Sequence, residues 1–142
     1  MQLLEYGLRP KKDYLMIAPW KDLYKLTEYW KEELSFYEDE LHFFENVLTV
    51  YEGPDNEEPE LRQLINDTAI QLRNLMIQTD LHLAHLGKII KEADNTEDLL
   101  FREEHDVLED NIIAFTNAFR QLRQKMFKTV ERKIPQSANS HK

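Results

Sequence analysis

The chain has 142 residues, contains no cysteine and carries a net charge of −9 at pH 7. This length is enough for one domain with a buried core, and the missing thiols exclude disulfides, thiolate metal sites and cysteine nucleophiles. The negative charge disfavours nucleic acids and anionic membrane surfaces as partners.

The first 18 residues contain several large apolar side chains but no long hydrophobic period. Gly7 and Pro10 interrupt any helix there, so we interpret residues 1–18 as an arm that packs on the rest of the protein. The segment lacks the apolar run of a signal peptide, and no stretch of the chain approaches the roughly 20 apolar residues of a membrane span. We therefore expect a cytoplasmic protein without a membrane partner.

Three long segments then show an unbroken apolar repeat with steps of four and three residues. This spacing keeps one apolar stripe on one face of a helix and favours coiled-coil-like packing. The first helix is predicted at about 19–52. It begins at a proline, which a first helical turn tolerates, and ends before the stop signal Gly53-Pro54.

The second and third helices follow after short loops that break the repeat. The second is predicted at about 59–93 and also begins at a proline. The third is predicted at about 96–133, because Pro135 cannot donate the next backbone hydrogen bond. Residues 135–142 are polar and lack a period, so we expect a disordered tail.

These elements define an all-α fold. Similar helix lengths and short loops favour an antiparallel up-down-up bundle of three long helices over residues 19–134, with the arm packed on it. The charge along the third segment agrees with this order, because it is acidic early and basic late. In the antiparallel arrangement its basic end lies beside the acidic loop at 55–58.

The first two helices carry more apolar surface than a three-helix bundle needs. Tyr29, Phe36 and Phe43 form a second stripe on the first helix, and Met76 and Leu83 belong to a similar one on the second. Exposed apolar patches usually mark interaction sites. The leading hypothesis is therefore a non-enzymatic interaction or scaffold module without a cofactor, which binds a protein partner or a second copy of itself through these residues.

A cluster of histidines supports an alternative hypothesis. His82 and His105 occupy positions of the apolar repeat, and the hairpin of the second and third helices should bring both to within about two turns of His85. Glu109 lies one turn from His105, and Glu33 should lie at the same level on the first helix. Imidazoles and carboxylates that converge inside a bundle bind iron, manganese or zinc.

A purely structural role fits the same residues. Histidines in a bundle core are often neutral and hydrogen-bonded to a neighbour. The chain lacks the Glu-x-x-His pattern of carboxylate metal bundles and the repeated histidine series of hemerythrin-like bundles. It also lacks a glycine-rich phosphate loop and a dinucleotide fingerprint. The interaction module therefore remains the main interpretation, and the metal-binding bundle is the alternative.

Overall fold

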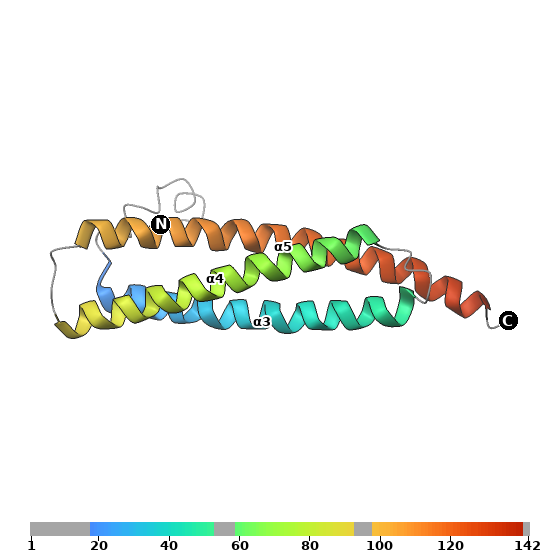
Figure 1. Cartoon of the computed structure of the whole chain (residues 1–142), viewed down its shortest axis with the longest axis horizontal. Helices are drawn as coiled ribbons and strands as arrows, with labels where there is room; N and C mark the ends of the chain where they lie inside the picture. Colours follow the sequence, from blue (N-terminus) through green and yellow to red (C-terminus); the bar gives the residue numbers. More distant parts are fainter. Residues whose placement is uncertain (1–17, 53–58, 93–97, 141–142) are drawn as a thin grey trace, which may run out of the picture. The chain divides into compact units, whose positions relative to one another are not determined.

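The described residues of the computed structural model are 18–52, 59–92 and 98–140. They form three helices: α3 spans Trp20–Glu52, α4 spans Pro59–Glu92 and α5 spans Asp98–Ser140 (Figure 1). The predicted all-α fold is thus confirmed for this part of the chain. The predicted arm lies outside the described residues, except for Ala18, which is buried.

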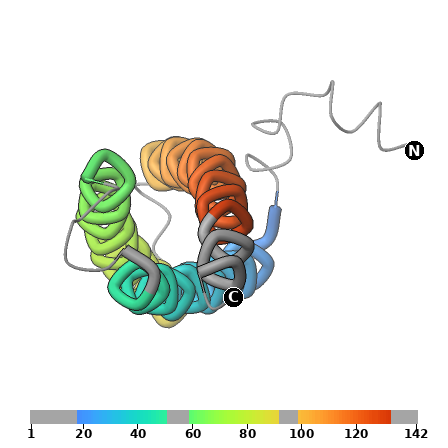
Figure 2. The backbone as a smooth tube through the Cα atoms, turned by 90° about the vertical axis from the view of Figure 1, so that its right-hand side faces the viewer, coloured from blue at the N-terminus to red at the C-terminus, as the bar shows by residue number. Residues whose placement is uncertain are grey.

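The chain divides into two compact units, and each contains a segment of all three helices. The first unit consists of Met1–Leu34 and Leu75–Ile113, and the second of Ser35–Asn74 and Ala114–Lys142. Within each unit the three helical segments lie side by side (Figures 1 and 2). Each core described below belongs to one of these units.

Ring contacts define the direction of two helices in the first unit. The ring centroids of Trp20 and Phe101 are 5.6 Å apart, and those of Trp30 and His105 are 4.8 Å apart. Later residues of α3 therefore meet later residues of α5, and the two segments run in the same direction.

The α4 segment of the first unit runs in the opposite direction. Leu86 is buried in one apolar cluster with Leu23 of α3, whereas Lys31 Nζ lies 3.2 Å from Asp80 Oδ1. The α4 residue number thus falls as the α3 number rises. The up-down-up order predicted from the loop lengths holds in this unit.

The core of the second unit is aromatic. The fully buried ring of Phe119 lies 4.6 Å from Tyr37, 5.9 Å from Phe44 and 5.9 Å from Phe115, measured between centroids. Offset and edge-on aromatic pairs of this kind stabilise a core beyond the area that they bury. They join α3 to α5 in this unit.

Three threonines within the apolar repeat are satisfied locally. The hydroxyls of Thr27, Thr68 and Thr79 each donate a 2.7 Å hydrogen bond to the backbone carbonyl four residues earlier. Because each hydroxyl finds an acceptor within its own helix, these residues can occupy core positions without a buried unpaired donor.

The last helix is longer than the sequence predicts. α5 continues through Pro135 to Ser140, beyond the predicted end near residue 133. Proline removes one backbone donor, but its fixed φ of about −65° is itself helical. Its ring also crowds the carbonyl four residues earlier, so proline at this position destabilises the helix by about 3 kcal/mol or more without ending it. Residues 141–142 lie outside the described residues.

Replacing Gly87 with alanine is expected to stabilise the protein by about 0.5–1 kcal/mol, because glycine in a helix interior carries an entropic cost. A Cβ atom at this position would lie 3.7 Å from Cε2 of Tyr24, which is an ordinary van der Waals distance. Thermal unfolding followed by circular dichroism tests this expectation. A lower melting temperature in Gly87→Ala would show that α4 and α3 approach more closely here than the structure indicates.

Candidate functional site

An exposed apolar stripe runs along α3. Tyr29, Phe36, Phe43 and Val50 follow one another at seven-residue intervals and expose 57%, 57%, 61% and 74% of their surface, respectively. We call these four residues the α3 stripe. Tyr29 belongs to the first unit and the other three to the second. The apolar residues that the sequence predicts as contacts on this helix thus face solvent.

The predicted contact residues of α4 are less exposed than those of α3. Met76 and Leu83 are half-buried, so they border the core of the first unit. The large apolar side chains that α4 exposes are Ile70, Ile77 and Leu81. The sequence could not separate these two sets, because both repeat at helical spacing. The broadest exposed aromatic face among the described residues is therefore that of α3.

One carboxylate beside the α3 stripe is held by a cation from α5. Arg123 donates to Glu40 through two hydrogen bonds, from Nε to Oε2 at 2.6 Å and from an Nη atom to Oε1 at 2.9 Å. The hydrogen bond with Glu40 raises the pKa of the Arg123 guanidinium. The guanidinium also lies 5.3 Å from the ring centroid of Phe119, so the ion pair covers the aromatic core of this unit.

The first unit contains a buried pair of histidines. His82 Nε2 lies 2.7 Å from His105 Nδ1, so one ring donates a hydrogen bond and the other accepts it. His105 is fully buried and stacks on Trp30, and His82 stacks on Phe101 at a centroid distance of 4.4 Å. Burial, with a smaller contribution from the charge of His85, lowers the pKa of His82 from 6.5 to about 4. His82 is therefore neutral at pH 7.

The structure brings together only some of the residues of the metal hypothesis. His82 and His105 are in direct contact, His85 packs edge-on against an aromatic ring of α5, and Glu33 and Glu109 are half-buried on their helices. Among the described residues, no group of three or more His, Asp or Glu side chains is arranged to hold a metal ion. The short hydrogen bond joins the two ring nitrogens that face each other, Nε2 of His82 and Nδ1 of His105. The geometry thus gives the metal hypothesis no specific support.

Arg102, a buried arginine of α5, was not predicted from the sequence, and its side chain reaches the beginning of α3. Arg102 donates a 2.7 Å hydrogen bond from an Nη atom to the backbone carbonyl of Ala18, and its guanidinium lies 4.0 Å from the centroid of the Trp20 ring. A charged residue directly after a core phenylalanine resembles an ordinary surface position in sequence. Its contacts with Ala18 and with the first residue of α3 indicate a structural role.

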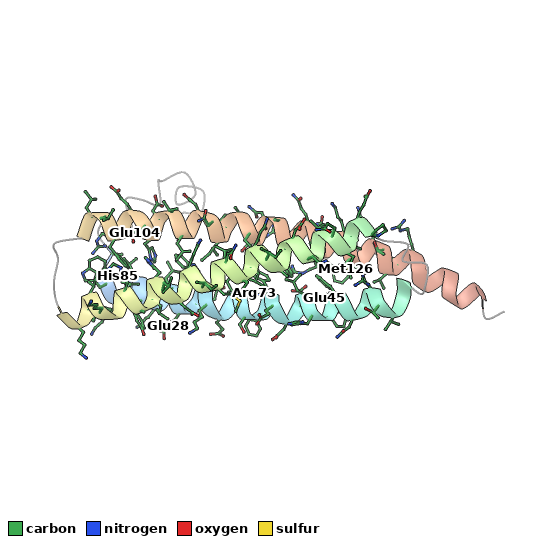
Figure 3. All side chains as sticks on the ribbon, in the orientation of Figure 1. Glu28, Glu45, Arg73, His85, Glu104 and Met126 are labelled. Carbon is green, nitrogen blue, oxygen red and sulfur yellow. The ribbon has the colours of Figure 1, made fainter. Side chains whose placement is uncertain are left out.

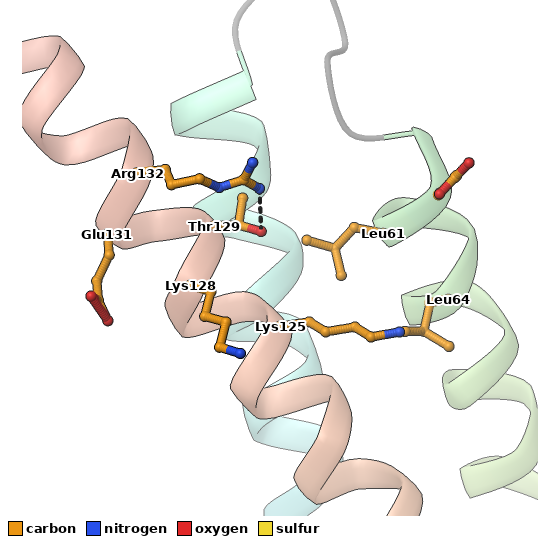
Figure 4. Close-up of a pocket in the computed structure, with 8 residues that line it drawn as sticks. Leu61, Leu64, Lys125, Lys128, Thr129, Glu131 and Arg132 are labelled. Atoms are coloured by element: carbon orange, nitrogen blue, oxygen red, sulfur yellow. Dashed lines mark hydrogen bonds between the residues drawn. The ribbon is translucent and has the colours of Figure 1, made fainter.

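A groove in the second unit lies between the first turns of α4 and the later part of α5 (Figure 4). It measures about 750 Å³ and has an apolar side formed by Leu61 and Leu64. Its other lining residues are mainly charged, with both signs present: Glu60, Lys125, Lys128, Thr129, Glu131 and Arg132. This mixture of charges does not define a ligand class.

A second groove of about 410 Å³ lies between α4 and α5 in the first unit. His82 and Leu108 line it together with His85 of α4 and Glu104 of α5, and Figure 3 labels the last two. One side of the otherwise buried His82 thus borders this groove.

Comparisons with known proteins give no match. No family model, no curated protein and no solved structure is significantly similar to the chain. Across 18–52, 59–92 and 98–140, no helix is long and apolar enough to cross a membrane. The functional inference therefore rests on the residues and their geometry.

Proposed function

We propose that the protein is a non-enzymatic interaction module that binds another helix along the α3 stripe. The observation that carries the proposal is the exposure of Phe36 and Phe43, two aromatic side chains seven residues apart on the outer face of a long helix. Burying a large apolar side chain stabilises a complex by about 1.5–3 kcal/mol when it starts fully exposed. Two such anchors supply a useful fraction of a binding energy.

The spacing of the stripe fits a helical partner. Residues separated by seven positions stay on one helix face, and a second helix can place its own apolar residues between them along a heptad seam. An amphipathic helix bound by an apolar surface contributes anchors at the same intervals. Val50 extends the stripe by one further heptad on α3.

The double substitution Phe36→Glu/Phe43→Glu is expected to abolish binding while leaving the helical content unchanged, because both side chains are exposed in the isolated chain. Binding is measured with three synthetic amphipathic helices that share one leucine face and carry lysine, glutamine or glutamate on the other. Sedimentation velocity of the protein alone reports self-association, and circular dichroism reports folding.

The matched control is Ile77→Glu/Leu81→Glu, which adds the same charge at exposed apolar positions of α4. It should keep the association that the α3 variant loses. If the wild-type protein stays monomeric and binds none of the three peptides, or if both variants lose binding equally, the proposed function of the α3 stripe is wrong.

A further inference from the structure

Acidic residues are the neighbours of Phe36 along the surface of α3. The positions three and four residues before and after Phe36 are its neighbours on the helix surface. All four of these positions are acidic in this chain: Glu32, Glu33, Asp39 and Glu40. The centre of the α3 stripe is therefore an apolar ridge between carboxylates.

Most of this negative charge is not compensated by the helices around it. Glu40 is held by Arg123, as described above. Glu32 and Asp39 are exposed and Glu33 is half-buried, and the described residues place no cation at ion-pair distance from these three. A partner that lies along the stripe would meet at least three carboxylates beside its apolar contact.

A second copy of the chain is a poor occupant of this surface. Two-fold pairing of α3 with itself around Phe36 would bring each set of carboxylates against the same set from the other copy. Like charges that face each other across an interface cost binding energy and suppress that pairing. Opposite charges at the same positions would instead favour encounter and fix the register.

We propose that the occupant of the α3 stripe is a cationic amphipathic helix from another protein, an inference that rests on the proposed function. Its apolar residues, one heptad apart, contact Phe36 and Phe43. Lysine or arginine side chains that flank them face Glu32, Glu33 and Asp39. The apolar contact supplies affinity, and the carboxylates select the sign of the partner's charge.

The experiment measures binding of fluorescent Leu/Lys, Leu/Gln and Leu/Glu helices to the full chain by anisotropy. We expect the Leu/Lys peptide to bind at least tenfold more tightly than the other two, with an affinity that falls as salt shortens the Debye length from about 10 Å at 0.1 M. The triple variant Glu32→Gln/Glu33→Gln/Asp39→Asn should weaken this binding by about tenfold.

Two matched variants separate a specific site from general attraction to an acidic protein. Glu103→Gln/Glu104→Gln/Glu131→Gln removes the same charge from α5 and should leave the Leu/Lys affinity within about twofold, since distant exposed charges are screened. Phe36→Gln/Phe43→Gln keeps the carboxylates and should weaken binding by at least tenfold. Equal losses in the two charge variants, or no loss in the phenylalanine variant, would overturn the inference.

The outcomes also distinguish this inference from the proposed function. If the Leu/Gln or Leu/Glu helix binds as tightly as the Leu/Lys helix and Phe36→Glu/Phe43→Glu abolishes that binding, the interaction module stands and its cationic partner does not. Self-association that the same double variant abolishes, without peptide binding, makes a second copy the occupant. Binding of none of the peptides, without self-association, overturns both.

Discussion

Replacing Phe119 with alanine is expected to lower the free energy of unfolding by about 4 kcal/mol, the largest loss that we predict for one side chain. The ring is fully buried and contacts Tyr37, Phe44 and Phe115, so its removal leaves a cavity between α3 and α5 of the second unit. The substitution also removes the aromatic surface beneath the Arg123 guanidinium.

Phe127 provides a matched control eight residues further along the same helix. Its side chain is 56% exposed, so Phe127→Ala deletes the same atoms with little change in buried area and should cost less than about 1 kcal/mol. Urea unfolding of both variants, followed by circular dichroism, gives the two free energies. Similar losses in the two variants would contradict the assignment of Phe119 to the core.

The contrast between Phe119 and Phe127 shows what could be predicted from the sequence. The four-three repeat of the third segment consists of Phe101, His105, Leu108, Ile112, Phe115, Phe119, Leu122 and Met126. Position 119 belongs to this repeat and position 127 does not, and the exposed fractions follow this difference. The repeat residues whose side chains the structure describes are buried, apart from Tyr37, which is half-buried. A helical period fixes which face of each helix is apolar before any tertiary contact is known.

Contacts that depend on the register between helices could not be predicted in the same way. The bonds of Arg123 with Glu40 and of Arg102 with Ala18 join residues 83 and 84 positions apart in the chain. A shift of one helical turn would separate both pairs, and loop lengths do not determine the register to that precision. The sequence also does not distinguish the half-buried Met76 and Leu83 from the exposed apolar residues of α4, because both sets repeat at helical spacing.

The histidine pair could be predicted in part: its position in the fold follows from the sequence, but its hydrogen bond does not. Their positions in the repeat predicted that His82 and His105 would be close together, and the structure places them in hydrogen-bonding contact. Whether two nearby imidazoles bond to each other or to a metal ion depends on a difference of about an ångström or two, since zinc–nitrogen bonds alone are about 2.0–2.1 Å long. Sequence spacing does not resolve such a difference.

Acidification from pH 7 to pH 5 is expected to destabilise the protein by about 1–2 kcal/mol through His82 alone. The unfolded chain binds a proton at this residue near pH 6.5, whereas burial lowers the folded pKa to about 4. Between these values the unfolded state holds more protons, so the stability that is fully present above pH 6.5 is lost as the pH falls toward 4.

Comparison with His82→Gln isolates this contribution, because carboxylates also begin to titrate near pH 5 and affect both proteins alike. Urea unfolding at pH 7, 6 and 5 should show a weaker pH dependence in the variant, whatever its stability at pH 7. His42→Gln, which alters an exposed histidine of α3, should retain the wild-type dependence. Replacing His85 with glutamine should weaken the dependence slightly, since the charge of His85 contributes to the low pKa of His82. If the wild type and His82→Gln lose stability in parallel, then burial does not lower the pKa of His82 in the folded protein, and the expectation is wrong.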